Sequence, residues 1–300
     1  MNFFWDLFLG GITRGSIYAL IALGYTMVYG ILELINFAHG EIYMIGAFTA
    51  LIVASILTMH GLTGISVLLL ATIIAVLYSS AYGFSVEKIA YKPLRQAPRL
   101  SPLISAIGMS IFLQNYIMLA QTSDFLPFPD LLQEFELPEI IAEWIAPSEF
   151  MIIFTAAVLM ICLTLVLKFT KMGKAMRAVA QDREMAMLLG INVNRIISRT
   201  FIIGSALAAI GGVLIGSHTG RINFYIGFAA GIKAFTAAVL GGIGSIPGAM
   251  LGGLVLGLTE SFATGYVSSD YENVFAFALL ILILIFKPEG ILGRSSQQKV

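Results

Sequence analysis

The stretch from residue 62 to residue 86, LTGISVLLLATIIAVLYSSAYGFSV, runs for 25 residues without a charged side chain or a histidine. A helix needs about 20 such residues to cross the hydrocarbon core of a bilayer. The stretch therefore predicts a membrane-spanning helix. Similar uncharged runs recur along the chain, and they are Gly15–Leu32, Ile42–Thr58, Leu100–Ser123, Phe150–Leu167, Thr200–Ser217, Ala234–Thr259 with the apolar residues before it, and Asn273–Phe286. We predict an all-α fold, a polytopic transmembrane helix bundle of eight to nine helices in a single domain over residues 1–300.

The composition excludes several other classes of protein. Hydrophobic residues make up 58% of the chain and charged residues 11%, against about 25% charged residues in soluble globular proteins. The 17 Lys and Arg balance the 17 Asp and Glu, so no overall positive field attracts nucleic acid. One cysteine and three scattered histidines offer neither an intrachain disulfide nor metal-ligand spacing. The first residues lack the basic n-region of a signal peptide, so we expect the first helix to be retained.

The distribution of charge predicts how the chain is oriented. Lys and Arg collect in residues 87–99, in residues 168–199 and in the tail from Lys287, and cytoplasmic loops of membrane proteins carry this excess. Residues 122–149 contain no Lys or Arg and seven acidic residues, which are Asp124, Asp130, Glu134, Glu136, Glu139, Glu143 and Glu149. We expect that segment to be an acidic periplasmic loop. Counting the spans from it puts the N-terminus outside and the C-terminus in the cytoplasm.

Two segments without Lys or Arg fall where this count requires cytoplasmic turns. They read ILELINFAHGE (31–41) and GGIGSIP (241–247). Irregular backbone at membrane depth is tolerated where it is buried in protein or lines a water-filled cavity, and a pair of interrupted segments in the two halves of a chain indicates a central pathway. We predict that 31–47 and 236–252 are broken or re-entrant helices that flank a pathway. The alternative is that both are ordinary tight turns at the membrane surface.

Polar and small residues in and near these segments are the candidates for lining the pathway, namely Asn36, His39, Glu41, Lys233, Gly241, Gly242 and Gly244. Ionisable groups at membrane depth face the protein interior or a water-filled cavity. For His39 and Glu41 we slightly favour a buried hydrogen-bond cluster that fixes the broken helix. Lys233 is expected to point inward. For Arg14 and Glu260 we favour a position at the membrane interface, because long side chains reach the headgroups. The alternative is that Arg14, Lys233 and Glu260 are paired.

The basic segment 168–199 has the sequence KFTKMGKAMRAVAQDREMAMLLGINVNRIISR. Its middle, Lys174–Leu189, has no Gly or Pro and consists largely of good helix formers. We predict one helix there, bracketed by Gly173 and Gly190, with a polar stripe formed by Lys174, Arg177, Gln181 and Glu184. Such a helix either lies on lipid headgroups or inserts into a groove of a partner protein.

Three motifs follow one another along the chain in the order in which they occur in a known family. They are Asn36-Phe-Ala-His-Gly-Glu41, Glu184-Met-Ala186-x-x-x-Gly190-Ile-Asn192 and Ala238-Val-Leu-Gly-Gly-Ile-Gly-Ser-Ile-Pro-Gly-Ala249. Together they resemble ABC importer permeases of the branched-chain amino acid family, most closely the smaller permease subunit. The second motif has Glu-Met-Ala where Glu-Ala-Ala is usual in the ATPase-docking loop of such permeases. The likeness extends over nearly the whole chain and is weakest across residues 122–149.

The resemblance implies a permease domain in the bacterial inner membrane that imports Leu, Ile and Val. Its partners would be a second homologous permease, two ABC ATPase subunits and a periplasmic substrate-binding protein. Residues 168–199 would be the cytoplasmic coupling loop, with Lys174, Arg177, Gln181, Glu184, Ala186, Gly190 and Asn192 as ATPase-coupling residues. Urea, amides or other small polar solutes are alternative cargo for the same machinery.

The chain lacks several motifs that would give it chemistry of its own. It has no Gly-x-x-x-x-Gly-Lys-[Ser/Thr] loop, so ATP is expected on the partner subunits and no cofactor on this chain. It has no Gly-x-Ser-x-Gly motif, and no catalytic triad stands out, so no enzyme is expected. The rival class is an ion-gradient-driven secondary transporter or channel. Such a protein needs titratable residues in mid-span, and here the candidates reduce to His39, Glu41 and Lys233.

Overall fold

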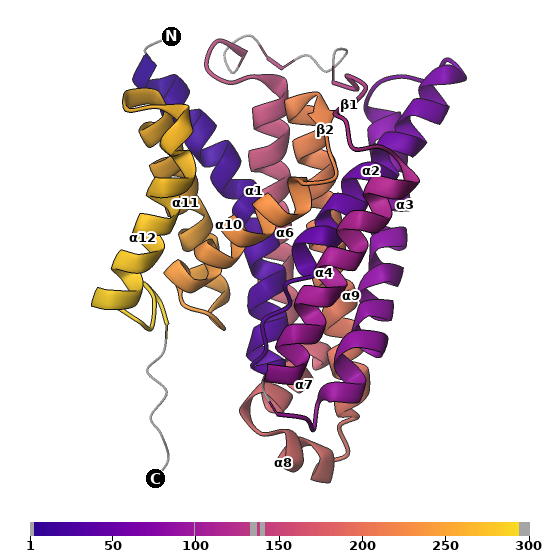
Figure 1. The fold of residues 1–300 in the computed structure, drawn as a ribbon, viewed down its shortest axis with the longest axis vertical. Helices are drawn as coiled ribbons and strands as arrows, with labels where there is room; N and C mark the ends of the chain where they lie inside the picture. The colour runs from indigo at the N-terminus through magenta and orange to yellow at the C-terminus, as the bar shows by residue number, and fades with distance from the viewer. Residues whose placement is uncertain (1–2, 99, 133–136, 139–141, 294–300) are drawn as a thin grey trace.

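A computed structural model describes residues 3–98, 100–132, 137–138 and 142–293, and these form a bundle of helices (Figure 1). In this part of the chain, eight helices are long and apolar enough to cross a membrane. This confirms the predicted polytopic helical fold. Three of the predicted acidic residues, Glu134, Glu136 and Glu139, and the tail beyond residue 293 fall outside the described residues.

Long helices alternate with shorter elements along the chain. The helices that form the eight candidate spans, α12 together with the turn before it, are Phe3–Leu32 (α1), His39–Met59 (α2), Ile65–Val86 (α3), Leu100–Ala120 (α4), Pro147–Phe169 (α6), Val193–Thr219 (α9), Ile246–Tyr266 (α11) and Glu272–Phe286 (α12). The other described helices are Lys171–Gln181 (α7), Arg183–Leu188 (α8) and Ile226–Gly241 (α10). Helical turns at Glu87–Tyr91 (η1) and Lys92–Leu94 (η2) extend α3, and Ser269–Tyr271 (η3) precedes α12. Two short strands, Leu126–Pro127 (β1) and Arg221–Ile222 (β2), pair antiparallel.

Helix α1 lies at the centre of the bundle and is packed most closely against α11. In the most apolar stretch of α1, 83% of residues are buried. Gly253 of α11 lies against Ala19, and Gly257 lies against Gly15. Lipid tails supply no hydrophobic drive for helices to associate, so small residues that allow close van der Waals contact take that role. These glycines therefore serve packing within the chain.

The helices are interrupted within both predicted segments, 31–47 and 236–252, and the position of these breaks relative to the membrane stays a prediction. Helix α1 ends at Leu32 and α2 begins only at His39, and α10 ends at Gly241 before α11 begins at Ile246. Gly242 and Gly244 have φ of 103° and 93°, a backbone conformation that favours glycine. Helix α10, with 16 residues, is about 24 Å long at 1.5 Å per residue. It is therefore shorter than the roughly 30 Å core of a bilayer.

The acidic and the basic segments lie at opposite ends of the bundle. The start of α1 and the β1–β2 pair lie toward the upper end in Figure 1, whereas α7 and α8 form the lower end. Phe128, in the acidic segment, is buried, and its N–H donates to the Gly220 carbonyl at 2.9 Å. Part of the predicted loop is thus fixed to the end of α9. Which end faces the cytoplasm stays a prediction from the charge bias.

We expect Gly253→Ala to destabilise the fold, because the added Cβ would lie 2.5 Å from the backbone nitrogen of Ala19. Overpacking of this kind costs about 1–3 kcal/mol. The matched control is Gly108→Ala in α4, where an added Cβ meets nothing within 4 Å. Thermal unfolding in detergent should show a lower midpoint for the first variant only. Equal midpoints would contradict the close α1–α11 packing.

Candidate functional site

The turn between α1 and α2 is fixed by a buried side chain. Asn36 is 1% exposed, and its Oδ1 accepts a hydrogen bond of 2.9 Å from the Tyr91 hydroxyl. Tyr91 belongs to η1, at the end of the long α3 span. Asn36 is therefore held inside the protein, as its candidate role in the pathway requires. Sequence analysis missed Tyr91, because nothing in the local pattern indicates a partner 55 residues away.

His39 and Glu41 lie in the first turn of α2 and are both buried. The His39 ring packs edge-on to Tyr25, with 4.9 Å between ring centroids, and fills the space left by the missing side chain of Gly24. Glu41 Oε1 accepts a hydrogen bond of 3.0 Å from the Ser110 hydroxyl of α4. These contacts connect α2 to two other helices, as expected of a buried cluster that fixes the interruption.

The same cluster retains polar atoms that could meet a solute. His39 Nε2 and Glu41 Oε2 are buried without a hydrogen-bond partner among the described residues. Ser110 and Gly227, both neighbours of Glu41, line an apolar cavity of about 130 Å³ between α1, α4 and α10. A role of His39 and Glu41 in the pathway stays a prediction.

Lys233 is the centre of a group of charges contributed by four helices. Its Nζ lies 3.2 Å from Glu260 Oε1 of α11 and also pairs with Glu272 of α12. Glu260 Oε2 accepts a hydrogen bond of 2.7 Å from the Tyr18 hydroxyl of α1, and Glu272 Oε2 lies 3.5 Å from Arg14 Nη1. Lys233 therefore points inward, as predicted. The ion pairs of Lys233 are separate from the contacts that Asn36, His39 and Glu41 make.

The expectation that Glu260 lies at the membrane interface is wrong. Its side chain is fully buried, because a carboxylate can be buried when a cation and a hydrogen-bond donor compensate it. Arg14 is 41% exposed and lies at the rim of the group. Glu272 and Tyr18 were not predicted to take part. Their positions in the sequence, far from Lys233, give no signal that the fold brings them together.

The predicted single helix 174–189 is also wrong. Helix α7 ends at Gln181, Asp182 is extended with φ of −159°, and α8 begins at Arg183. Asp182 Oδ1 accepts a hydrogen bond of 2.9 Å from the Met185 N–H and so caps α8. Aspartate is a poor residue inside a helix and a strong N-cap. The predicted polar stripe is therefore divided, with Glu184 on a different helix from Lys174, Arg177 and Gln181.

Of the two glycines predicted to bracket this segment, Gly190 marks a helix end and Gly173 does not. Gly190, with φ of 80°, ends α8, and the Ile191 N–H donates to the Ala186 carbonyl at 3.0 Å, the pattern of a glycine C-cap. Helix α7 begins before Gly173, and Thr170 Oγ1 caps it by accepting from the Gly173 N–H at 3.1 Å. Gly173 therefore lies inside the helix. Its backbone packs on that of Leu167 so closely that no Cβ would fit, which accounts for a glycine at this position.

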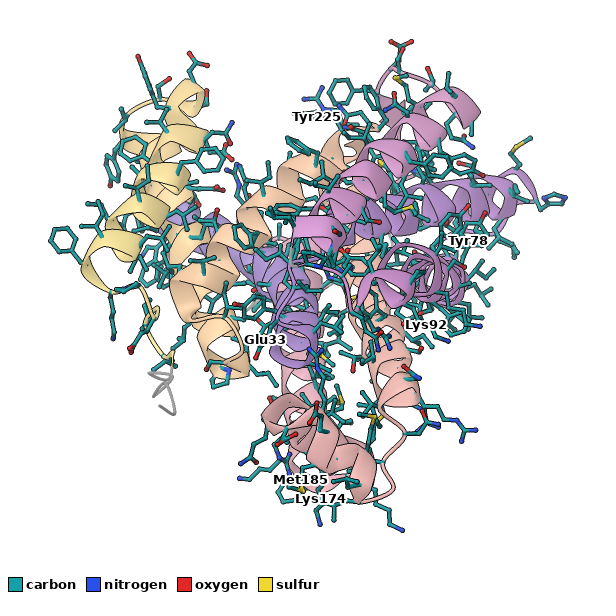
Figure 2. The ribbon with its side chains drawn as sticks, turned by 60° about the horizontal axis from the view of Figure 1, so that its bottom comes forward. Glu33, Tyr78, Lys92, Lys174, Met185 and Tyr225 are labelled. Atoms are coloured by element: carbon teal, nitrogen blue, oxygen red, sulfur yellow. The ribbon has the colours of Figure 1, made fainter. Side chains whose placement is uncertain are left out.

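The predicted coupling residues differ in exposure. Lys174, Arg177, Gln181, Glu184 and Gly190 are exposed, Ala186 is buried, and Asn192 caps α9 by accepting from the Arg195 N–H at 3.0 Å. Beside them lies an exposed apolar group that we name the α8 surface, formed by Met185 (54% exposed), Met187 (56%), Leu188 (81%) and Leu189 (74%). Figure 2 shows Lys174 and Met185 on the outermost part of the segment, away from the bundle.

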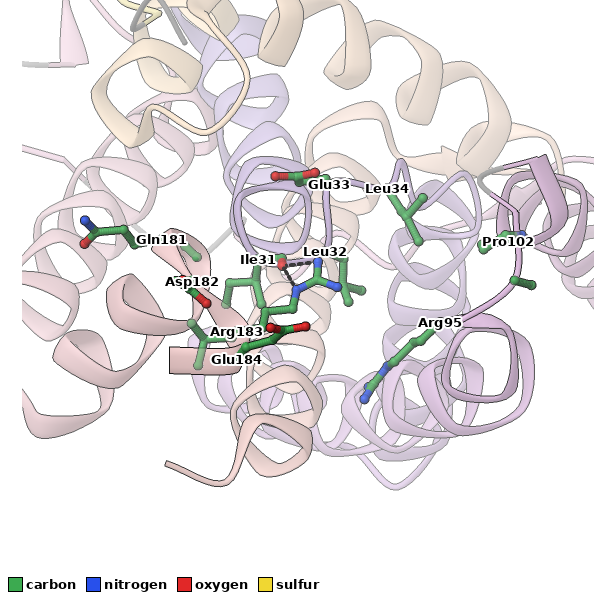
Figure 3. Close-up of a pocket in the computed structure, with 13 residues that line it drawn as sticks. Ile31, Leu32, Glu33, Leu34, Arg95, Pro102, Gln181, Asp182, Arg183 and Glu184 are labelled. Carbon is green, nitrogen blue, oxygen red and sulfur yellow. Dashed lines mark hydrogen bonds between the residues drawn. The ribbon is translucent and has the colours of Figure 1, made fainter. Parts of the chain in front are cut away.

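A polar cavity of about 390 Å³ lies between this segment and the end of α1 (Figure 3). Arg183 crosses it to reach the Ile31 carbonyl. On its other side Arg95 donates to Asn194 Oδ1 at 2.5 Å and pairs with the buried Glu87. Burial lowers the pKa of the Arg95 guanidinium, and the negative charge of Glu87 opposes that shift. Arg183 and Arg95 were not among the predicted site residues.

We expect Lys233→Met to destabilise the protein strongly, because it leaves Glu260 buried without its cation. Removing one partner of a buried ion pair costs about 3–5 kcal/mol. The double variant Lys233→Met/Glu260→Gln should recover most of that loss, since no uncompensated charge remains. Thermal unfolding in detergent measures both, with Lys168→Met at the exposed end of α6 as the control. A single variant as stable as the control would contradict the pairing.

Comparison with known proteins identifies the family. The model of the family described as branched-chain amino acid transport system / permease component matches residues 7–284. The permease protein LivH of the high-affinity branched-chain amino acid transport system of Escherichia coli K12 is 50% identical over 302 residues, covering 99% of this chain and 98% of LivH. The corresponding protein BraD of Pseudomonas aeruginosa is 52% identical, covering 97% of this chain and 96% of BraD.

A more distant relative is a second permease of the same kind of system. LivM of Salmonella typhimurium is 23% identical over 95% of this chain and 70% of its own length. The relatives are permease proteins and not enzymes, and with eight apolar helices they indicate a multi-pass protein of the bacterial inner membrane. The chain belongs to the family of permease components of branched-chain amino acid transport systems.

Proposed function

We propose that this chain is the permease subunit of an ATP-driven importer of Leu, Ile and Val and forms the translocation pathway together with a second permease. The observation that carries the proposal is the α8 surface, four exposed apolar side chains on a segment that projects from the bundle. A contiguous exposed apolar patch indicates a protein–protein interface. The basic residues around it favour a cytoplasmic position.

The partners follow from what this chain lacks and from its relatives. No nucleotide-binding loop is present, so two partner ATPases supply ATP binding and this chain binds no cofactor. The second permease is a protein of the LivM kind, to which this chain is related. A periplasmic binding protein delivers the amino acid to the end that carries the acidic segment 122–149, which requires the N-terminus to lie outside.

The proposed mechanism is alternating access driven by the ATPases. The α8 surface seats in a groove of an ATPase and moves when ATP binding closes the ATPase pair. Because α7–α8 joins α6 to α9 through short connections, that movement reaches two spans directly. The interruptions at 33–38 and 242–245 allow half-helices to move relative to one another while the rest of the bundle stays packed.

Reconstitution tests the proposal. Vesicles containing this chain, the second permease and both ATPases should accumulate leucine only with ATP on the ATPase side and the binding protein on the other side. A protonophore should leave uptake unchanged. Uptake driven by an ion gradient without ATP would instead identify a secondary transporter. Competition by isoleucine and valine, but not by urea or acetamide, should define the cargo.

The end of α8 gives a sharper prediction. We expect Gly190→Val to abolish ATP-driven uptake while membrane insertion is unchanged, because a β-branched residue is strained at φ of 80°. The matched control is Gly190→Asn, since asparagine tolerates this conformation, and it should retain uptake. Glu184→Ala should also abolish uptake. Normal uptake in both Gly190→Val and Glu184→Ala would contradict the assignment of this segment as the coupling loop.

A further inference from the structure

The cytoplasm-proximal end of α1 leaves a buried backbone acceptor that needs a partner. The last four carbonyls of a helix have no intrahelical donor. Ile31 belongs to this set, and its side chain is 4% exposed. The chain turns away directly after it, at Glu33 with φ of 54°. A buried carbonyl without a donor costs free energy, so the end of α1 depends on another element.

Arg183 is the donor, and it comes from α8. Its Nε donates to the Ile31 carbonyl at 3.1 Å and its Nη2 at 2.6 Å (Figure 3). The positive guanidinium also faces the negative end of the helix dipole. Lysine could supply one of these bonds but not the fixed fork that makes both. The contact joins residues 152 positions apart in the chain.

The break at Asp182 separates Arg183 from the arginine of the preceding helix. Arg177 of α7 donates to the Leu167 carbonyl, at the end of α6. The loop is thus linked to two different helix ends, through Arg177 to the span directly before it and through Arg183 to α1. Only the second contact reaches a helix that the loop does not adjoin in sequence.

The end of α1 leads directly into the candidate pathway. Four residues after Leu32 comes Asn36, which is bonded to Tyr91, and α2 then begins with His39. His39 packs back against Gly24 of α1. A displacement of the end of α1 would therefore move the turn 33–38 and the buried cluster that fixes this turn.

We propose that Arg183 is a positioning residue that transmits the movement of α8 to the end of α1 and the turn 33–38. The inference rests on the proposed function, because it takes α8 as the segment that an ATPase moves. Arg183 itself is half-buried and faces the bundle, opposite in role to the exposed α8 surface. One short helix therefore carries both the exposed α8 surface and the link to α1.

The test compares variants in the reconstituted complex of both permeases, both ATPases and the binding protein. Arg183→Met removes both donors and keeps a long side chain, Arg183→Lys keeps the charge, and Arg195→Met is the control at an exposed arginine near the start of α9. The readouts are co-purification of the ATPases, leucine taken up per ATP hydrolysed, and the mobility of a spin label at Leu34→Cys in a Cys162→Ala background.

We expect Arg183→Met to keep the ATPases bound but to lower leucine uptake per ATP by about tenfold or more, the effect of losing a charge-assisted hydrogen bond. Its spin label should no longer respond to trapping with ATP and vanadate. Arg183→Lys should be intermediate, and Arg195→Met should match the unchanged protein.

Two results would overturn the proposal. One is unchanged uptake per ATP in Arg183→Met with a normal spin-label response. The other is loss of the ATPases on purification, which would make Arg183 part of the docking surface. If the unchanged complex shows no ATP-dependent uptake but the spin label still responds to ATP with vanadate, the proposed import fails while the mechanical link stands.

Discussion

The helix interruptions after α1 and α10, in the part of the chain that the structure describes, share one constraint, that buried backbone polar groups must find partners. The structure meets it with a different device at each interruption. In the turn after α1 the Tyr91 hydroxyl donates to the Ile35 carbonyl at 3.4 Å, and at the end of α1 an arginine from α8 covers the Ile31 carbonyl. The segment after α12 donates from Ile291 and Leu292 to the last carbonyls of α10. Each device joins elements far apart in the chain, so the irregular segments also hold the bundle together.

Close packing is what makes these distant contacts possible. Glycines of α11 bring it against α1, and glycines at α1 and α9 leave the space that the His39 ring occupies. Within this frame the buried polar groups include Glu41 with Ser110 and Lys233 with Glu260. In the second of these sets Lys233 compensates Glu260 by an ion pair, whereas among the described residues Glu41 pairs with no cation and its Oε2 has no hydrogen-bond partner.

The segment of α7 and α8 shows how local and distant forces combine. Its caps, Thr170, Asp182 and Gly190, follow from local backbone chemistry. Its attachment does not, because the acceptors of Arg177 and Arg183 are carbonyls at the ends of other helices. The exposed Met and Leu side chains of α8 are left over after these attachments are made. A surface that the fold does not use is available to a partner.

Periodicity and composition by themselves determined the helical membrane class, the presence of helix breaks within 31–47 and 236–252, and the glycine stop at residue 190, because each depends on local backbone preference and the length of apolar runs. They missed the break at Asp182, since good helix formers on both sides conceal a strong N-cap. Only the tertiary structure decided that Glu260 is buried against Lys233 and that Arg183 reaches Ile31. Those pairings join residues 27 and 152 positions apart, and the energy of burying a charge or a carbonyl depends on which distant group compensates it.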